Sequence, residues 1–281
     1  MINTPGTSAA AATTFDGYPL AQKGEAGRAL GIAVISSTVG GIFSVLILCF
    51  AAPLLARVAY EFRSPEYFAL TVFGLSMLAS ISAGGAVKNL IGGIFGVWLS
   101  TIGAERVTGI ERFMFGNYEL YEGLHFVPIF IGLFAISELL VQSKTVDKII
   151  KTVSMKAVKL PTLEDYKKIW KTILRSCGIG TFIGVLPAEG ATVASMIGYS
   201  EARRWSKNKK EFGKGSIEGI AGAEAANNAA TGGAMVPTMV LGIPGSGTTA
   251  IILVGLMVHG LRPGVYLFTE QVEKVYQIFG S

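Results

Sequence analysis

Long apolar stretches, separated by short polar ones, dominate the first half of the chain. Four of them approach the length of about 20 residues that a helix needs to cross a hydrocarbon core of about 30 Å. They are residues 30–58, 65–82, 86–102 and 124–141. The pattern predicts about four transmembrane helices over residues 30–141, the first of which is tilted or overlong.

Basic runs divide the second half. Residues 142–175 and 201–215 are rich in Lys and Arg, whereas the loop before residue 124 is net acidic. Basic loops beside membrane spans mark the cytoplasmic side, so we expect residues 142–175 to form a cytoplasmic loop or amphipathic segment. Both runs are interpreted as solvated loops, with contact to lipid headgroups or a partner as the alternative.

The segment between the basic runs, residues 176–200, is too short for two full crossings and is interrupted by Pro187-Ala188-Glu189-Gly190. If both runs are cytoplasmic, this segment enters and leaves on the same side. We therefore expect a re-entrant hairpin. Irregular backbone at membrane depth is tolerated where it lines a cavity, which places a cavity near this interruption.

The stretch EGIAGAEAANNAATGGAMVPTMVLGIPGSGTTA, Glu218–Ala250, combines apolar character with Gly, Pro and amide residues. Gly232-Gly233, Pro237 and Pro244-Gly245 are expected to interrupt any helix. Unpaired amides are costly in lipid, so the adjacent Asn227 and Asn228 must face a partner, water or a ligand. Hydrogen bonds that join helices are the alternative.

Composition supports a membrane protein. The 281 residues are 51% hydrophobic and 15% charged, with a mean hydropathy of +0.52, whereas soluble domains carry about 25% charged residues. The net charge of +5 is clustered, which indicates orientation in a membrane rather than nucleic-acid binding. Cys49 and Cys177 lie in apolar runs and are expected to be buried free thiols.

The distribution of charge predicts symport. Residues 176–200 and 216–261 contain no Lys or Arg, and a helix N-terminus offers only about +0.5 charge. Two such termini cannot neutralise a di- or tricarboxylate, so a cation bound near Asn227, Asn228 or Glu224 would supply the missing charge. Acidic residues in membranes are functional candidates, which makes Glu224 and Glu189 the cation-coupling candidates, with a position near the interface as the alternative. The coupling ion is Na⁺ or H⁺, and we expect no cofactor and no metal.

Other chemistry has little support. His125 and His259 are isolated, and Gly245–Thr249 imitates a phosphate-binding loop but lacks its Lys. A membrane-embedded enzyme that binds a nucleotide would need a soluble α/β domain, for which the chain has no pattern. We therefore expect no enzyme. A channel-like or structural membrane subunit stays open as an alternative.

Four stretches together resemble the large membrane subunit of tripartite tricarboxylate transporters. One is the stretch quoted above, and the others are DGYPLAQKGEAGRALGIA (residues 16–33), RFMFGNYELYEGLHFVPIFIGLFAISELL (112–140) and GVLPAEGATVASMIGYSEARRWSK (184–207). The resemblance implies cation-coupled secondary active uptake of carboxylates such as citrate across the bacterial inner membrane. It also implies two partners, a small membrane subunit and a periplasmic solute-binding protein.

The resemblance further implies an all-α, multi-span helical bundle with re-entrant or broken helices from an inverted or internal repeat. Residues 1–29 then hold the tail of the first-repeat motif and a cytoplasmic loop, and residues 176–281 hold the second-repeat transport motif. Family members are roughly twice as long, so the chain is interpreted as a fragment, which leaves an inactive fragment as one alternative. Members usually have Pro-Gly where this chain has Pro187-Ala188.

The candidate substrate-binding residues are the small, hydroxyl and amide residues of these motifs. They are Asn227, Asn228, Thr231, Pro244, Gly245, Ser246, Gly247, Thr248, Thr249, Gly190, Ala191, Thr192, Asn3, Thr4, Pro5, Gly6 and Thr7.

Overall fold

The computed structural model describes residues 7–81, 86–105, 108–125, 128–129, 131–136, 140, 143, 160–186 and 190–280. Within these ranges the regular secondary structure is helical, apart from one short pair of antiparallel strands, and turns or loops join the elements. The helix content agrees with the expected all-α membrane class. The number of membrane crossings and the re-entrant hairpin stay predictions.

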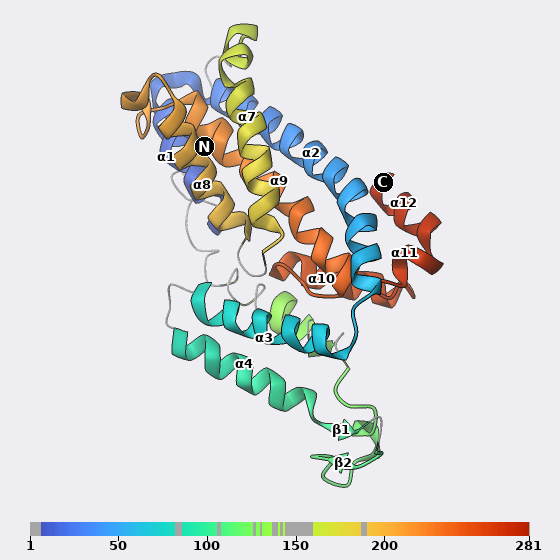
Figure 1. Cartoon of the computed structure of the whole chain (residues 1–281). Helices are drawn as coiled ribbons and strands as arrows, with labels where there is room; N and C mark the ends of the chain where they lie inside the picture. Colours follow the sequence, from blue (N-terminus) through green and yellow to red (C-terminus); the bar gives the residue numbers. More distant parts are fainter. Residues whose placement is uncertain are drawn as a thin grey trace.

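Helix α9 (Ile217–Leu241) runs through the middle of the main bundle, with α2, α7 and α8 packed around it (Figure 1). It begins after Ser216, whose side chain accepts a hydrogen bond from the Gly219 amide. It ends at Gly242, whose left-handed backbone (φ 70°) closes the last turn. Ala and Gly predominate along the helix, so neighbouring backbones can approach it closely.

Helix α2 (Ala26–Tyr60) has 35 residues and is about 52 Å long at 1.5 Å per residue. It lies along α9 and buries every fourth residue over most of its length, a spacing that forms one ridge of a helix surface. The buried residues of this ridge are Ile32, Ser36, Gly40, Ser44, Leu48, Ala52 and Ala56. Small side chains again dominate the contact.

We expected a loop before residue 30, but residues 8–25 are helical. A short 3₁₀ helix η1 (Ser8–Ala10) leads into α1 (Ala11–Leu20), and a π-helical turn η2 (Ala21–Glu25) joins α1 to α2. Gly24 has φ 82° inside this turn, so the helix is broken there, and α1 and α2 leave the turn in different directions (Figure 1). As a result, α1 also packs on α9.

Helices α7 (Leu163–Gly184) and α8 (Gly190–Trp205) form a helical hairpin against α9. The approach of α7 to α9 is very close. A Cβ added to Gly180 would lie 2.2 Å from the carbonyl oxygen of Ala226, and one added to Gly233 would lie 2.2 Å from that of Thr181. No residue larger than Gly fits at either position without moving a backbone.

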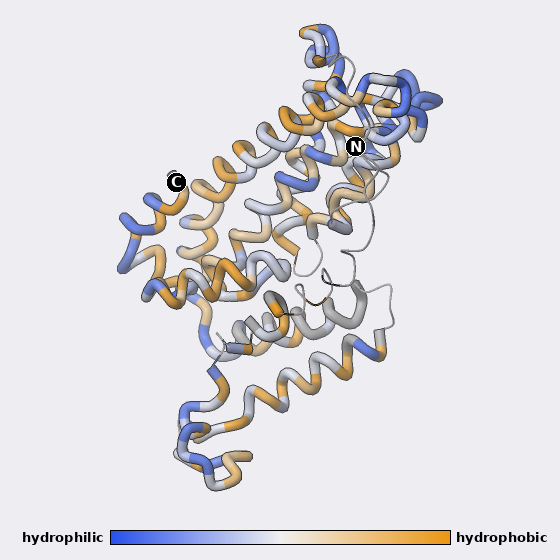
Figure 2. The backbone as a smooth tube through the Cα atoms, turned by 180° about the vertical axis from the view of Figure 1, so that it is seen from behind, coloured by the Kyte–Doolittle hydropathy of each residue, from blue (hydrophilic) through white to orange (hydrophobic). Residues whose placement is uncertain are grey.

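The two basic runs meet at one end of this hairpin. Lys168 in α7 forms an ion pair of 3.7 Å with Glu211 in the 3₁₀ helix η5 (Lys209–Glu211). The Arg175 guanidinium lies 5.1 Å from the centre of the Trp205 ring. Figure 2 shows hydrophilic residues gathered at this end of the bundle. The side of the membrane that this end faces stays a prediction.

Helices α3 (Ser64–Ile81) and α4 (Ala86–Ser100) pack on each other and lie beyond the lower end of α9 in Figure 1. They match the expected spans 65–82 and 86–102. A two-residue strand pair, β1 (Gly103–Ala104) with β2 (Glu111–Arg112), and a 3₁₀ helix η3 (Tyr118–Leu120) follow. Within the expected fourth span, 124–141, the structure describes a π-helix η4 (Ile131–Ile136).

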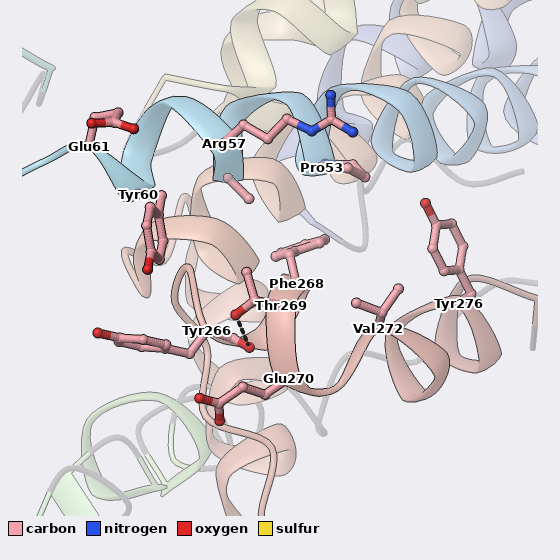
Figure 3. A pocket seen from close by; sticks show the side chains of 11 residues that line it. Pro53, Arg57, Tyr60, Glu61, Tyr266, Phe268, Thr269, Glu270, Val272 and Tyr276 are labelled. Atoms are coloured by element: carbon pink, nitrogen blue, oxygen red, sulfur yellow. Dashed lines mark hydrogen bonds between the residues drawn. The ribbon is translucent and has the colours of Figure 1, made fainter.

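The C-terminal helices α10 (Gly247–Val258), α11 (Leu267–Glu270) and α12 (Val272–Gly280) cover the lower ends of α2 and α9. A cavity of about 750 Å³ lies between the end of α2 and the α11–α12 segment (Figure 3). Arg57, Tyr60 and Tyr266 are among its lining residues, and the Thr269 hydroxyl donates a 3.2 Å hydrogen bond to the Tyr266 carbonyl.

One helical stretch of the described residues, Ser8–Tyr60, is long and apolar enough to cross a membrane. Shorter apolar helices cover Leu90–Ser100 and Gly247–Val258. Large apolar side chains are exposed along α2 and α4, including Phe50 and Ile94. Such surfaces are unusual on soluble monomers and are expected on helices that face lipid.

Candidate functional site

A polar stripe runs along one face of α9. It comprises Glu224, Asn227, Asn228 and Thr231, whose spacing of three and four residues brings them to the same side of a helix. Glu224 and both Asn residues are half-buried and Thr231 is exposed, whereas the neighbouring Ala225, Ala226, Ala229 and Ala230 are buried. The stripe is therefore the side of α9 that α2, α7 and α8 leave least covered.

Glu224 is the best-defined member of the stripe because both of its carboxylate oxygens accept hydroxyl hydrogen bonds. The Thr13 hydroxyl of α1 donates to Oε1 and the Ser37 hydroxyl of α2 donates to Oε2, each at 2.7 Å. Three helices thus meet at one carboxylate. Among the described residues, no Lys, Arg or His forms an ion pair with Glu224, so its neighbours are neutral donors.

The two amides do not join helices in the part of the chain that the structure describes. The Nδ2 of Asn228 donates a 3.1 Å hydrogen bond to the Glu224 carbonyl of its own helix. The Asn227 side chain makes no hydrogen bond to a described residue. Contact of these amides with a ligand or water stays a prediction.

The start of α8 lies beside the first helical turn of the chain. The Ser8 and Thr192 hydroxyls lie 2.9 Å apart, and η1 contacts both α8 and α9. Gly190 is buried, and Ala191 packs against a cluster that includes Ala226 and Ala230. The motif around Gly190–Thr192 therefore reaches the middle of α9.

Some of the candidate site residues lie outside the residues that the structure describes. These are Asn3, Thr4, Pro5, Gly6 and Glu189, and the Pro187-Ala188 departure is likewise outside the described residues. Thr7 is described, and its hydroxyl accepts a 3.3 Å hydrogen bond from the Ala10 amide, which caps η1.

The turn that contains Pro244–Thr249 lies further along α9. Gly245 packs on Ala234, and its amide donates to the Thr238 hydroxyl at 3.3 Å. Ala234 follows Glu224 by ten residues, which is about 15 Å along a helix. The turn and the Glu224 contacts therefore occupy two places along α9, with Asn227 and Thr231 between them.

Most hydroxyls of this turn are engaged in capping α10. The Ser246 amide donates to the Thr249 hydroxyl at 2.8 Å, and the Thr249 amide donates to the Ser246 hydroxyl at 3.2 Å. Thr249 is buried, Gly247 and Pro244 are half-buried, and Thr248 is exposed. Thr248 is thus the hydroxyl of the turn that faces outward, whereas Ser246 and Thr249 stabilise the start of the helix.

One expectation is wrong. Gly232-Gly233 and Pro237 do not interrupt α9, which continues to Leu241. The two glycines lie where Ser44 of α2 and Thr181 of α7 come closest, so packing outweighs their low helix propensity. Near Pro237, the Thr238 hydroxyl donates to the Ala234 carbonyl at 2.7 Å.

The partners of Glu224 are not predicted from the sequence. Thr13 and Ser37 are more than 180 residues away along the chain, and neither interrupts its helix. A weak signal existed in the adjacent hydroxyls Ser36-Ser37 within an apolar run. A third missed residue is Asp16, which is fully buried although it is an acid.

Comparison with known proteins decides the family. The tripartite tricarboxylate transporter TctA family matches residues 1–281. The chain belongs to this family. The TctA family is a family of membrane transporters that work with other subunits, which agrees with the apolar helices and with the expectation of no enzyme.

Two curated relatives from Agrobacterium vitis are similar to this TctA-family chain. The first is an "Uncharacterized 52.8 kDa protein in TAR-I ttuC' 3'region", 40% identical over 283 residues that cover 100% of the chain and 56% of the relative. The second is an "Uncharacterized protein in TAR-II ttuC' 3'region", 41% identical over 102 residues that cover 36% of the chain and 42% of the relative. The chain spans about half the length of the curated relatives it matches. No solved structure matches it.

Proposed function

We propose that the chain takes part in secondary active uptake of tricarboxylates or related carboxylates, such as citrate, across the bacterial inner membrane. It does so as the large membrane subunit, or part of it, together with a small membrane subunit and a periplasmic solute-binding protein. Membership in the TctA family supports this proposal. The exposed apolar side chains of α2 and α4 support a location in the bilayer.

The observation that carries the proposal is the environment of Glu224. Its carboxylate lies between three helices, and its described partners are the neutral hydroxyls of Thr13 and Ser37. Hydroxyl donors stabilise a carboxylate but leave its net charge, and a net charge inside a membrane is costly. The site is therefore best occupied by a cation, Na⁺ or H⁺, and this cation couples transport to an ion gradient.

Substrate binds, in this proposal, on the open part of the same stripe. Asn227 and Thr231 offer an amide and a hydroxyl that no described residue engages, and the N-termini of α8 and α10 lie near the same part of α9. These groups are neutral or carry partial positive charge. A carboxylate bound there would need the charge of the coupling cation, so the two would bind together.

The test is Glu224→Gln in the full-length transporter with its partner subunits, reconstituted in vesicles. Uptake of radiolabelled citrate is measured against increasing Na⁺ at fixed pH and against decreasing pH at fixed Na⁺. We expect uptake at low cation concentration to fall about tenfold or more, because a charged hydrogen-bonded group is lost. In the same variant, the concentration of coupling cation that gives half-maximal uptake should rise.

The matched control is Glu218→Gln. Glu218 is on the same helix and also accepts a hydrogen bond from a hydroxyl, that of Ser206, but it lies in the first turn of α9. Uptake by the Glu218→Gln variant should keep the wild-type cation dependence. Cation dependence that is identical in wild type and Glu224→Gln would contradict the coupling role, and a flux that does not saturate with citrate would favour a channel.

A further inference from the structure

Asp16 is an acid that the proposed transport site does not use, and it is fully buried in α1. Its Oδ1 accepts hydrogen bonds from the backbone amides of Gly215 and Ser216, each at 2.8 Å. These two amides immediately precede α9, which begins at Ile217. A side chain of one helix is thus bonded to the start of another.

Capping alone does not account for this arrangement. Ser216 already caps α9, because its hydroxyl accepts the Gly219 amide at 3.3 Å. The acceptor Asp16 lies on a different helix, α1, and the two amides that donate to it lie just before α9. Their effect is therefore to fix α1 relative to α9.

The surroundings of Asp16 make this junction tight. Its Oδ2 has no hydrogen-bond partner among the described residues, and a Cβ added to Gly219 would lie 2.2 Å from that oxygen. The Tyr199 ring of α8 lies 5.5 Å from the Phe15 ring and 5.4 Å from the Phe212 ring, in edge contacts. Two helices and the loop before α9 therefore hold α1 at this point.

The junction lies one helical turn from the proposed coupling site. Asp16 follows Thr13 by three residues, so both are on the same side of α1, and Thr13 donates the hydroxyl bond to Glu224 at 2.7 Å. Within the described residues, the polar side-chain bonds from α1 to α9 and the residues just before it are those of Thr13 and Asp16. A shift of α1 at Asp16 would move Thr13 away from the carboxylate.

We propose that Asp16 is a positioning residue for the coupling site. By accepting the amides at the start of α9 it fixes α1 along α9, and it thereby holds the Thr13 hydroxyl on Glu224. This inference rests on the proposed function of Glu224. Asp16 itself does not touch the cation or the substrate.

The experiment is a double-mutant cycle in the reconstituted full-length transporter with its partner subunits. Thr13→Val, Asp16→Ala and the double variant are compared by the Na⁺ concentration, and separately the pH, that gives half-maximal uptake of radiolabelled citrate. Each single variant should change the half-saturating cation concentration about tenfold and in the same direction, since each loosens the same hydroxyl bond to a charged group. If H⁺ is the coupling ion, the pH of half-maximal uptake should rise, because a donor that stabilises the ionised carboxylate is lost. The double variant should match the larger single effect.

Two further variants separate positioning from general stability. Asp16→Asn keeps the Oδ1 acceptor, so its half-saturating cation concentration should stay within about twofold of that of wild type. Asp165→Asn removes a similarly buried acid that caps α7 instead, and it should lower thermal stability without changing cation dependence. If Asp16→Ala does not assemble, Asp16→Ser takes its place in the cycle, because its side chain is too short to reach both amides.

The outcomes are distinct. If the double variant changes the half-saturating cation concentration by the product of the two single effects, Asp16 and Thr13 act independently and the inference is overturned. It is also overturned if Asp16→Ala changes thermal stability but not the cation dependence. In either case a changed cation dependence in Glu224→Gln would leave the proposed function standing. If Glu224→Gln and Thr13→Val both keep the wild-type cation dependence, the proposed function and the inference fail together.

Discussion

Helix α9 and the α3–α4 pair are both apolar, yet their side chains are placed in opposite ways. In α9 the large residues Ile220 and Met239 are 0% exposed, and Ala and Gly occupy 11 of its 25 positions. In α4, by contrast, Val87 is 69% exposed and Ile94 is 61% exposed. Hydropathy alone does not separate these helices, but their content of small residues does.

The difference follows from the solvent. In a bilayer, lipid tails are as apolar as Leu, so large apolar side chains gain little by packing on another helix. Small residues gain more, because they let backbones come into contact. The helix rich in small residues is therefore the one on which its neighbours pack, while the helices rich in large residues face outward.

The largest expected effect comes from adding one methyl group to each region. Gly233→Ala places a Cβ 2.2 Å from the Thr181 carbonyl oxygen of α7, so the helices must separate, at a cost of about 3 kcal/mol or more. Gly96→Ala in α4 places a Cβ that meets no described residue within 4 Å, and it should stabilise by about 0.5 kcal/mol through helix propensity. Thermal unfolding of the purified proteins in detergent measures both. Equal effects would show that the two regions do not differ in packing.

The sequence predicts much of this fold where a helix is set by its own residues. The expected spans 30–58, 65–82 and 86–102 agree with α2, α3 and α4 to within a few residues. Helix α9 could not be predicted in the same way. Its Gly and Pro residues argue against a helix locally, and the contacts with Ser44 and Thr181 that outweigh them come from distant segments.

The candidate site shows the same limit. The adjacent Asn227 and Asn228 and the acid Glu224 are visible in the sequence as polar residues in an apolar run. The hydroxyls that bond Glu224, and the amides that bond Asp16, are 187 to 211 positions away along the chain. Pattern reasoning finds the acid, but only the fold shows which neutral groups surround it.

A smaller effect is expected from the ion pair that fastens α2 to α7. The Nε of Arg28 donates to Asp165 at 2.9 Å, and Asp165 also bonds the Thr162 amide at the start of α7. Asp165→Asn should cost about 2 kcal/mol, since hydrogen bonds to a charged group are lost. Lys88→Ala on the exposed surface of α4 should change stability by less than about 0.5 kcal/mol. Chemical unfolding at neutral pH compares the two variants.

The same pair predicts a pH dependence. The hydrogen bonds from Arg28 lower the pKa of Asp165, against the opposing effect of burial. A lowered pKa contributes stability that is present above the ordinary carboxyl value of about 4 and is lost as the pH falls through the lowered value. Wild type and Asp165→Asn should therefore converge in stability in acid. A constant difference down to about pH 2 would contradict the ionic origin of the effect.

The smallest expected effect is the loss of a single methyl group. Ile220→Val in the buried face of α9 should lower the free energy of unfolding by about 1 kcal/mol, because it leaves a small void. Ile94→Val on α4 leaves none and should have almost no effect. A loss at Ile94 as large as that at Ile220 would indicate that a further polypeptide segment covers α4.

The glycine contacts between α7 and α9 have a mechanical consequence. Side chains that interdigitate can change rotamer and let helices slide by small steps, as in shear motions. Gly180 and Gly233 offer no rotamer to change, and the carbonyl oxygens opposite them would collide with any displaced side-chain neighbour. We therefore expect the α7–α9 pair to move as one block. In the proposed transport cycle we then expect rearrangement where the backbone turns, such as at Gly24 and Gly242, whose left-handed conformations separate α1 from α2 and α9 from α10.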